Sequence, residues 1–82
     1  MPKQVLMISS SKCVYCDQAK QLLTDNEYQY RDIDLYDPDQ LDEVIAFTQN
    51  YGNFHTVPQI VIEDSIVGGY EDLVTYLKEI RK

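Results

Sequence analysis

Residues 5–24 read VLMISSSKCVYCDQAKQLLT, an apolar run followed by two cysteines and then a helical pattern. The run at residues 5–8 has the length and composition of a buried strand. The pattern after it places one apolar face on a helix: Cys16, Ala19, Leu22 and Leu23. A thiol at a strand-to-helix junction meets free N–H groups and the positive end of a helix dipole, which both favour the nucleophilic thiolate. Because Cys16 lies within reach of Cys13, the pattern predicts thiol–disulfide exchange.

Other interpretations of Cys-x-x-Cys require features that this chain lacks. A zinc site needs about four ligands, whereas the chain has two cysteines and one histidine, His55. A metal or cluster shared between two chains stays open. A purely structural disulfide is disfavoured in a chain without a secretory leader, because cytosolic thiols are kept reduced.

The bulk composition predicts one globular domain over residues 1–82. Hydrophobic residues make up 44% of the chain, which is typical of globular rather than disordered proteins. The N-terminus shows no apolar signal segment, and no run approaches the length of a membrane span. We therefore expect a protein of the reducing cytoplasm with no membrane partner.

The net charge of −7 comes from one part of the chain. Residues 25–43 contain a single base, Arg31, and eight acids: Asp25, Glu27, Asp32, Asp34, Asp37, Asp39, Asp42 and Glu43. A solvated face that promotes solubility is the simpler interpretation, and guidance toward a basic partner protein is the other. Both disfavour nucleic-acid binding, which needs a basic stripe.

The remaining pattern predicts a small α/β layer fold in the order β-α-β-α-β-β-α. Four strands are expected at residues 3–8, 28–34, 58–62 and 66–67. Three helices are expected from Cys13 to about Thr24, from Asp37-Pro38 to Tyr51, and over residues 70–81. The second helix should bury Leu41, Val44, Ile45 and Thr48, and the third Leu73, Val74, Leu77 and Ile80. Strands linked by a helix should run parallel, and the two strands of the 58–67 hairpin antiparallel.

This order and three motifs together resemble the glutaredoxin branch of the thioredoxin fold over essentially the whole chain. The motifs are Cys13-Val14-Tyr15-Cys16, Thr56-Val57-Pro58-Gln59-Ile60 and Gly68-Gly69-Tyr70-Glu71-Asp72-Leu73. Residues 13–24 look most like bacteriophage-encoded glutaredoxins. The resemblance implies a thioredoxin-like α/β fold with a mixed four-stranded sheet and three helices.

Two positions depart from the common family pattern. Val14 stands where proline is usual, so this chain keeps a backbone N–H beside the nucleophile. Ser10 stands where a lysine is frequent, three residues before the first cysteine. Lys12 is the candidate for the missing positive charge in substrate binding, although it would act from a different direction.

The resemblance assigns catalytic roles to both cysteines. Cys13, at the cap of the helix, is the exposed nucleophile, and Cys16, one turn inside, is the resolving thiol. Asp17 follows directly; it suits the helix dipole but opposes a thiolate.

The resemblance also assigns the substrate groove. Tyr15 forms one wall, and Pro58 has a cis peptide bond that brings the Val57 backbone beside the sulfurs. The Val57 main chain pairs like a β-strand with the cysteine of glutathione, and Thr56 flanks its glycine end.

The third helix should hold the other end of glutathione. Gly69 lets the chain pass close to a ligand, and Tyr70, Glu71 and Asp72 begin a helix whose N–H groups suit a carboxylate. Asp72 can pair with the γ-glutamyl ammonium, although acids at these positions also favour a helix start. His55 lies near the groove in sequence, and an ordinary surface position is its simpler interpretation.

The function implied is that of a monomeric glutaredoxin, which reduces protein disulfides and glutathione mixed disulfides. It has no bound cofactor, uses glutathione as the reducing co-substrate, and has ribonucleotide reductase as one electron acceptor. Two alternatives stay open. One is a thioredoxin-like donor reduced by thioredoxin reductase, and the other is a binding module that lacks catalysis or bridges an iron–sulfur cluster between two chains.

Overall fold

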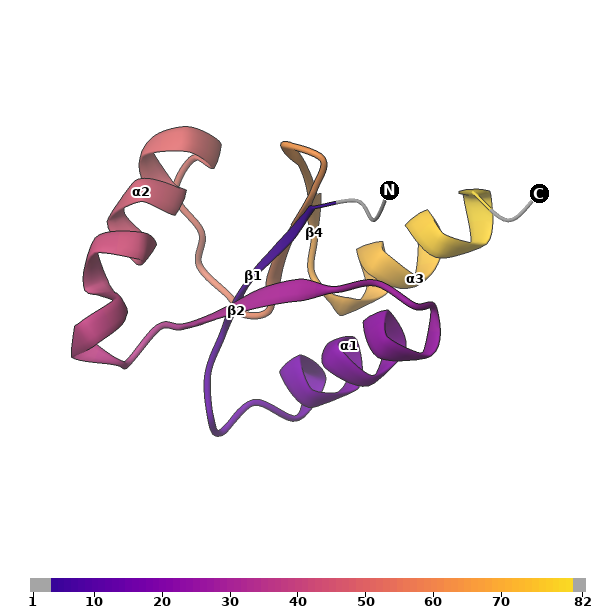
Figure 1. Ribbon diagram of the computed structural model, residues 1–82, viewed down its shortest axis with the longest axis horizontal. Coiled ribbons are helices and arrows are strands. Elements are labelled where there is room, and N and C mark those ends of the chain that lie inside the picture. The colour runs from indigo at the N-terminus through magenta and orange to yellow at the C-terminus, as the bar shows by residue number, and fades with distance from the viewer. Residues whose placement is uncertain (1–3, 81–82) are drawn as a thin grey trace.

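The computed structural model describes residues 4–80 as a twisted sheet with helices on both faces (Figure 1). Its elements in chain order are β1 (Val5–Ser9), α1 (Val14–Asp25), β2 (Tyr30–Asp34), the 3-10 helix η1 (Pro38–Gln40), α2 (Leu41–Tyr51), β3 (Gln59–Ile62), β4 (Ser65–Gly68) and α3 (Tyr70–Ile80). The predicted element order is confirmed, with most boundaries within two residues. The expected strand residue Lys3 and helix residue Arg81 lie outside the described residues.

The four strands form one mixed sheet in the order β2-β1-β3-β4. β1 pairs in parallel with β2 and antiparallel with β3, and β3 pairs antiparallel with β4. A tight turn joins β3 to β4, in which Glu63 and Asp64 have φ values of 51° and 64°. Positive φ at both central residues is the geometry of a two-residue hairpin turn. The predicted hairpin is confirmed, with a turn one residue shorter than the gap at 63–65 between the predicted strands.

One predicted strand direction is wrong. β2 and β3 are linked through α2 but run antiparallel, since β1 is parallel to the first and antiparallel to the second. The reason lies in residues 52–58, which follow α2 without regular structure and lead back to the sheet (Figure 1). Gly52, with a φ of 93°, ends α2 and begins this return. β3 therefore starts at the end of the sheet where β2 finishes.

Two hydrophobic clusters cover the two faces of the sheet. The cluster under α1 and α3 contains Val5, Met7, Ala19, Leu23, Ile60, Ile62, Leu73 and Leu77. The cluster under α2 contains Ile8, Ile33, Val44, Phe47 and Val61. The alternation of Met7 and Ile8 between the clusters follows the period of two expected for a strand buried on both faces. β1, the strand that leads to the cysteines, is therefore held by hydrophobic packing on both of its faces.

The inner face of α2 differs from the prediction. Val44 and Phe47 are buried, whereas Leu41 and Ile45 are exposed to 54% and 45%. The Phe47 ring packs against Tyr51 and against the return segment, so the aromatic side of the helix turns toward the sheet. In α3, Leu73 and Leu77 are buried as predicted, Val74 is half-buried, and Ile80 is exposed. No helix within residues 4–80 is long and apolar enough to cross a membrane.

Candidate active site

Cys13 is the N-cap of α1, as the sequence predicted. Its backbone is extended (φ −112°, ψ 112°), and its Sγ accepts a hydrogen bond from the Cys16 N–H at 3.0 Å. A sulfur in this position replaces the oxygen of an ordinary N-cap and meets the positive end of the helix dipole. Both features favour negative charge on Cys13 once the disulfide is reduced.

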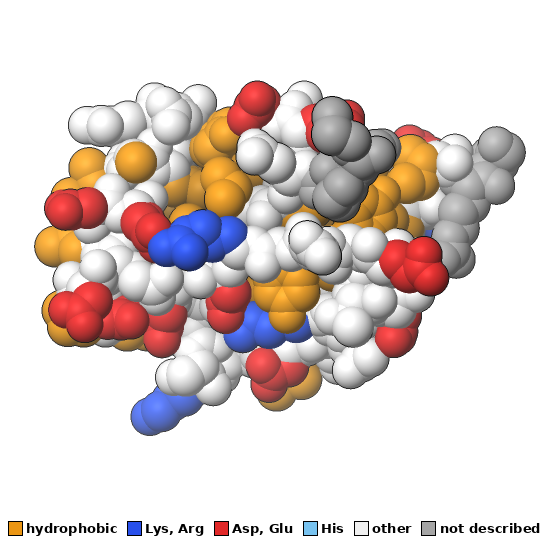
Figure 2. Space-filling model, viewed as in Figure 1, with side chains coloured by type: hydrophobic (Ala, Val, Ile, Leu, Met, Phe, Trp, Pro, Cys, Tyr) orange, Lys and Arg blue, Asp and Glu red, His pale blue; other side chains and the backbone are white. Residues whose placement is uncertain are grey.

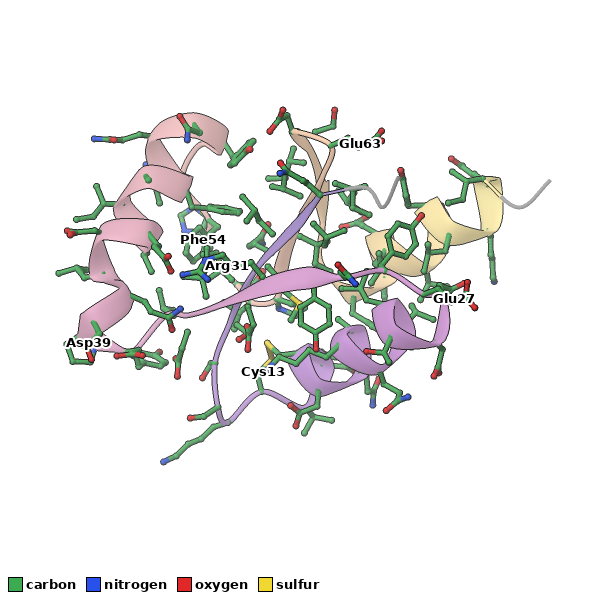
Figure 3. All side chains as sticks on the ribbon, viewed as in Figure 1. Cys13, Glu27, Arg31, Asp39, Phe54 and Glu63 are labelled. Carbon is green, nitrogen blue, oxygen red and sulfur yellow. A yellow bond between two sulfur atoms is a disulfide. The ribbon has the colours of Figure 1, made fainter. Side chains whose placement is uncertain are left out.

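The two cysteines are joined in a disulfide, with their Cα atoms 5.2 Å apart. Cys13 is partly exposed at the start of α1 (Figure 3), whereas Cys16 is fully buried. An external disulfide therefore has access to Cys13 and not to Cys16. This asymmetry agrees with the predicted order of nucleophile and resolving thiol.

The segment that faces the disulfide comes from the loop before β3. The Val57–Pro58 peptide bond is cis, as the resemblance implied, and the Val57 carbonyl oxygen lies 3.7 Å from Cys13 Sγ. Pro58 is buried. The Gln59 side chain donates a hydrogen bond to the Thr56 carbonyl at 2.9 Å and so ties the two sides of the bend together. Backbone polar groups of this loop are thus held next to the reactive sulfur.

The N-terminus of α3 is capped by one of the helix's own side chains. The Asp72 carboxylate accepts a hydrogen bond from the Gly69 N–H at 3.1 Å, which is the back-reaching half of a capping box. Gly68, with a φ of 117°, lies so close that a Cβ there would overlap the Asp72 carboxyl group. Glycine at this position is therefore needed both for the backbone conformation and for the space that Asp72 occupies.

A groove of about 490 Å³ joins these parts. Its lining consists of Tyr15, Thr56, Val57, Pro58, Gln59, Gly68, Gly69, Tyr70, Glu71 and Asp72. The Tyr15 and Tyr70 rings meet at 5.9 Å between centroids and connect the starts of α1 and α3. The groove therefore runs past the Val57 backbone to the N-terminus of α3.

Most of the residues predicted for substrate binding meet in this groove. Lys12 is the exception; it is exposed in the loop before the nucleophile, with its N–H 3.4 Å from Ser10 Oγ, and does not line the groove. Gln59 was not predicted to line it. The signal for Gln59 was its position next to Pro58 in the second motif. His55 instead lines a neighbouring hollow that shares Thr56 and Val57 with the groove.

Two ion pairs connect β2 to the helices on either face. Lys20 on α1 pairs with Asp32 at 2.8 Å, and Asp32 also accepts a hydrogen bond from Ser9, at the end of β1. The hydrogen bond to Asp32 raises the pKa of Lys20 above its ordinary value. On the other face Arg31 pairs with Glu43, and this hydrogen bond lowers the pKa of the Glu43 carboxyl. Across residues 4–80, no group of three or more His, Cys, Asp or Glu side chains is arranged to hold a metal ion.

The fold and the capped cysteine pair define a thiol–disulfide oxidoreductase of thioredoxin-like architecture. The sequence profile described as Glutaredoxin matches residues 5–67, so this chain belongs to the glutaredoxin family. Members of the family are thiol–disulfide oxidoreductases, and this chain carries the redox-active cysteine pair.

Individual relatives agree with this assignment. Glutaredoxin 1 of Rickettsia prowazekii is 35% identical over 77 residues, covering 94% of this chain and 80% of the relative. Glutaredoxin 1 of Escherichia coli is 33% identical, covering 93% of this chain and 94% of the relative. The crystal structure of Francisella tularensis glutaredoxin 1 in complex with cacodylate superposes with a TM-score of 0.75 at 26% identity, covering 95% of both chains. The thioredoxin-like fold is thereby confirmed.

Proposed function

We propose that this protein is a glutathione-dependent oxidoreductase that reduces protein disulfides and glutathione mixed disulfides. The family uses glutathione as a co-substrate. The observation that carries the proposal is the groove, which leads from the Val57 carbonyl beside Cys13 to the capped N-terminus of α3. A tripeptide thiol with a charged α-amino acid at one end fits both ends of such a groove.

Each part of the groove has a role in binding glutathione. The Val57 backbone pairs with the cysteinyl residue, as an added strand pairs with a sheet edge. The N–H groups that begin α3 attract the γ-glutamyl carboxylate. One Asp72 oxygen holds the Gly69 N–H, and the other is available to the γ-glutamyl ammonium. Tyr15, Thr56, Pro58, Tyr70 and Glu71 complete the walls, and Lys12 supplies positive charge from outside.

The first chemical step is attack by Cys13. Its thiolate forms a new S–S bond with one sulfur of the substrate disulfide, and the other sulfur leaves as a thiolate that takes up a proton. The Cys16 N–H supports the Cys13 thiolate before the attack. The product is a mixed disulfide on Cys13.

The second step depends on the substrate. Cys16, as a thiolate, attacks the Cys13 sulfur of a protein mixed disulfide, closes the Cys13–Cys16 disulfide and releases the reduced protein. One glutathione then reopens this disulfide by bonding to Cys13, and a second removes the glutathionyl group as glutathione disulfide. Two electrons thus pass from two glutathione molecules to the substrate.

We infer the setting in which this reaction occurs from the same features. A recycled dithiol suits the reducing cytoplasm, with residues 1–82 acting as one monomeric domain. Ribonucleotide reductase is our candidate acceptor, because its disulfide is reduced by small donors of this fold. The likeness of residues 13–24 to bacteriophage glutaredoxins stays a prediction, because the relatives named above are bacterial.

A coupled assay tests the proposal. Oxidised protein and NADPH are supplied either with glutathione and glutathione reductase or with thioredoxin reductase, and NADPH oxidation is followed with a mixed disulfide as acceptor. We expect turnover with the glutathione system only. Equal turnover with thioredoxin reductase would favour the thioredoxin-like donor instead.

A further inference from the structure

A second hollow adjoins the groove at Thr56 and Val57, and the Val57 carbonyl oxygen lies 3.7 Å from Cys13 Sγ. Its volume is about 540 Å³, and its lining consists of Leu35, Tyr36, Phe54, His55, Thr56 and Val57. Thr56 and Val57 line both the groove and this hollow. A chain that pairs with the Val57 backbone is therefore adjacent to both the groove and the hollow.

The hollow is lined mainly by apolar and aromatic side chains. Tyr36 is 75% exposed, although it is a large aromatic residue that lines this hollow. Phe54 is anchored to α2 through an edge-to-face contact with Phe47 at 5.9 Å, and Figure 3 places it between α2 and the sheet. The described lining contains no Lys or Arg. An apolar side chain is the occupant that best matches this wall.

Acidic residues flank the hollow in the chain. Asp34 and Asp37 stand on either side of Leu35-Tyr36, and their carboxylates accept the N–H groups of Tyr36 and Asp39, each at 2.9 Å. These bonds fix the loop. Within residues 4–80 the ion pairs of Lys20 and Arg31 involve other acids. Acidic side chains also gather around the start of α2, next to Asp39 of η1 (Figures 2 and 3).

We propose that this hollow binds the polypeptide that flanks the disulfide of a protein substrate, and that it selects an apolar residue beside the cysteine with Lys or Arg beyond it. The proposal deepens the function proposed above, since it names the class of protein disulfide that the same site accepts. Glutathione, a tripeptide, has too few residues to fill both the groove and the hollow. The hollow therefore distinguishes protein substrates from small ones. Its acidic rim, Asp34 and Asp37, distinguishes basic partners from acidic ones.

A single-turnover reaction measures how the residues on either side of the substrate cysteine affect the rate. The probe is a blocked Lys-Leu-Cys-Leu-Lys peptide joined by a disulfide to 2-nitro-5-thiobenzoate. The Cys13 thiolate bonds to the peptide sulfur and releases coloured thionitrobenzoate, after which Cys16 displaces the peptide thiol. The companion probes are the Glu-Leu-Cys-Leu-Glu peptide and 2-mercaptoethanol, each joined to the same leaving group. The protein is reduced with dithiothreitol and desalted, so no glutathione takes part.

Wild-type protein should react faster with the Lys peptide than with the Glu peptide, by about tenfold at low salt and by less at high salt. Tyr36→Ala should slow the Lys peptide by at least about fivefold, because truncating a central contact costs that much or more. Its rate with the mercaptoethanol probe should stay within about twofold of wild type. The matched control is Ile66→Ala, an exposed apolar residue on β4, which should change neither rate.

The rim is tested by Asp37→Asn, which keeps the acceptor for the Asp39 N–H while removing the charge. It should reduce the Lys-over-Glu preference about two- to fivefold, whereas Asp25→Asn, at the far end of α1, should reduce it less. Equal slowing of the peptide and mercaptoethanol probes by Tyr36→Ala would overturn the proposal. So would no slowing at all, or a preference that responds equally to both Asp variants. Because the probe reactions contain no glutathione, their rates do not depend on the outcome of the glutathione-coupled assay. The two proposals can therefore fail separately.

Discussion

The helices α1 and α3 both begin at the groove, but their first turns are capped by different chemical groups. At α1 the Cys13 sulfur accepts the Cys16 N–H, and at α3 the Asp72 carboxylate accepts the Gly69 N–H. Each helix directs the positive end of its dipole toward the same groove. On α1 this field acts on a reactive atom, and on α3 we propose that it acts on a bound carboxylate. In this proposal the same feature, a capped helix start, serves both chemistry and binding.

Removing the nucleophile at the start of α1, while keeping an N-cap, should have the largest effect. Cys13→Ser replaces the only accessible thiol with a hydroxyl that is not nucleophilic at neutral pH, and Cys16 is buried. We expect turnover to fall to background in the glutathione-coupled assay with every disulfide. Residual activity above background would show that Cys16 can act as a nucleophile and would break the distinction between the two cysteines.

Removing the resolving thiol should separate the two substrate classes. Cys16→Ser keeps the Cys13 nucleophile but cannot close the protein disulfide. We expect it to remove glutathione from a small mixed disulfide and to fail on an intramolecular protein disulfide. The two rates are measured with the same enzyme preparation. Equal loss on both substrates would contradict the assigned roles.

Removing the α3 cap should affect binding rather than chemistry. A charge-assisted contact with an ammonium contributes ~1.5–3 kcal/mol, and the exposure of Asp72 reduces this, so Asp72→Ala should raise the glutathione KM roughly tenfold. Loss of the bond to Gly69 should also lower the free energy of unfolding by about 1 kcal/mol. Glu79→Ala, an acid in the last turn of the same helix, is the control for charge. An unchanged glutathione KM would reduce the α3 end to a structural cap.

A smaller effect is expected from the Lys20–Asp32 pair, which joins α1 to β2. A double-mutant cycle with Lys20→Met and Asp32→Asn should give a coupling of ~0.2–1 kcal/mol at pH 7, measured by urea unfolding. Because the folded state raises the pKa of Lys20, this stabilisation is complete below the unfolded pKa of ~10.4. It is lost as the pH rises through the raised value. A coupling that persists in strong alkali would contradict an ionic origin.

Local signals in the sequence predicted the elements well but not all of their directions. The cap at Cys13 and the apolar spacing after it placed α1 to within one residue of its observed end. The direction of β3 depends on the irregular return segment after Gly52, for which periodicity gives no signal. The inner face of α2 was misassigned because Leu41 and Ile45 share the helical spacing, whereas the bulk of Phe47 decides which side packs.

The candidate site was predicted where a motif joins neighbouring residues, and was incomplete where the fold joins distant ones. Thr56 to Pro58 and Gly69 to Asp72 were identified from their motifs and meet in the groove. The hollow beside them was not predicted, because it brings Tyr36 and Phe54 together from opposite ends of α2. Contacts of that kind follow from tertiary structure rather than from spacing in the chain.

The pH dependence of Cys13 alkylation, measured in reduced wild-type protein and in Asp72→Ala, tests the division between the two helix starts most directly. Our account predicts a midpoint below the ~8.5 of a free cysteine, because the α1 cap favours the thiolate. It also predicts the same midpoint in the variant, since Asp72 belongs to the binding end. A midpoint near that of free cysteine, or one that moves with Asp72→Ala, would contradict it.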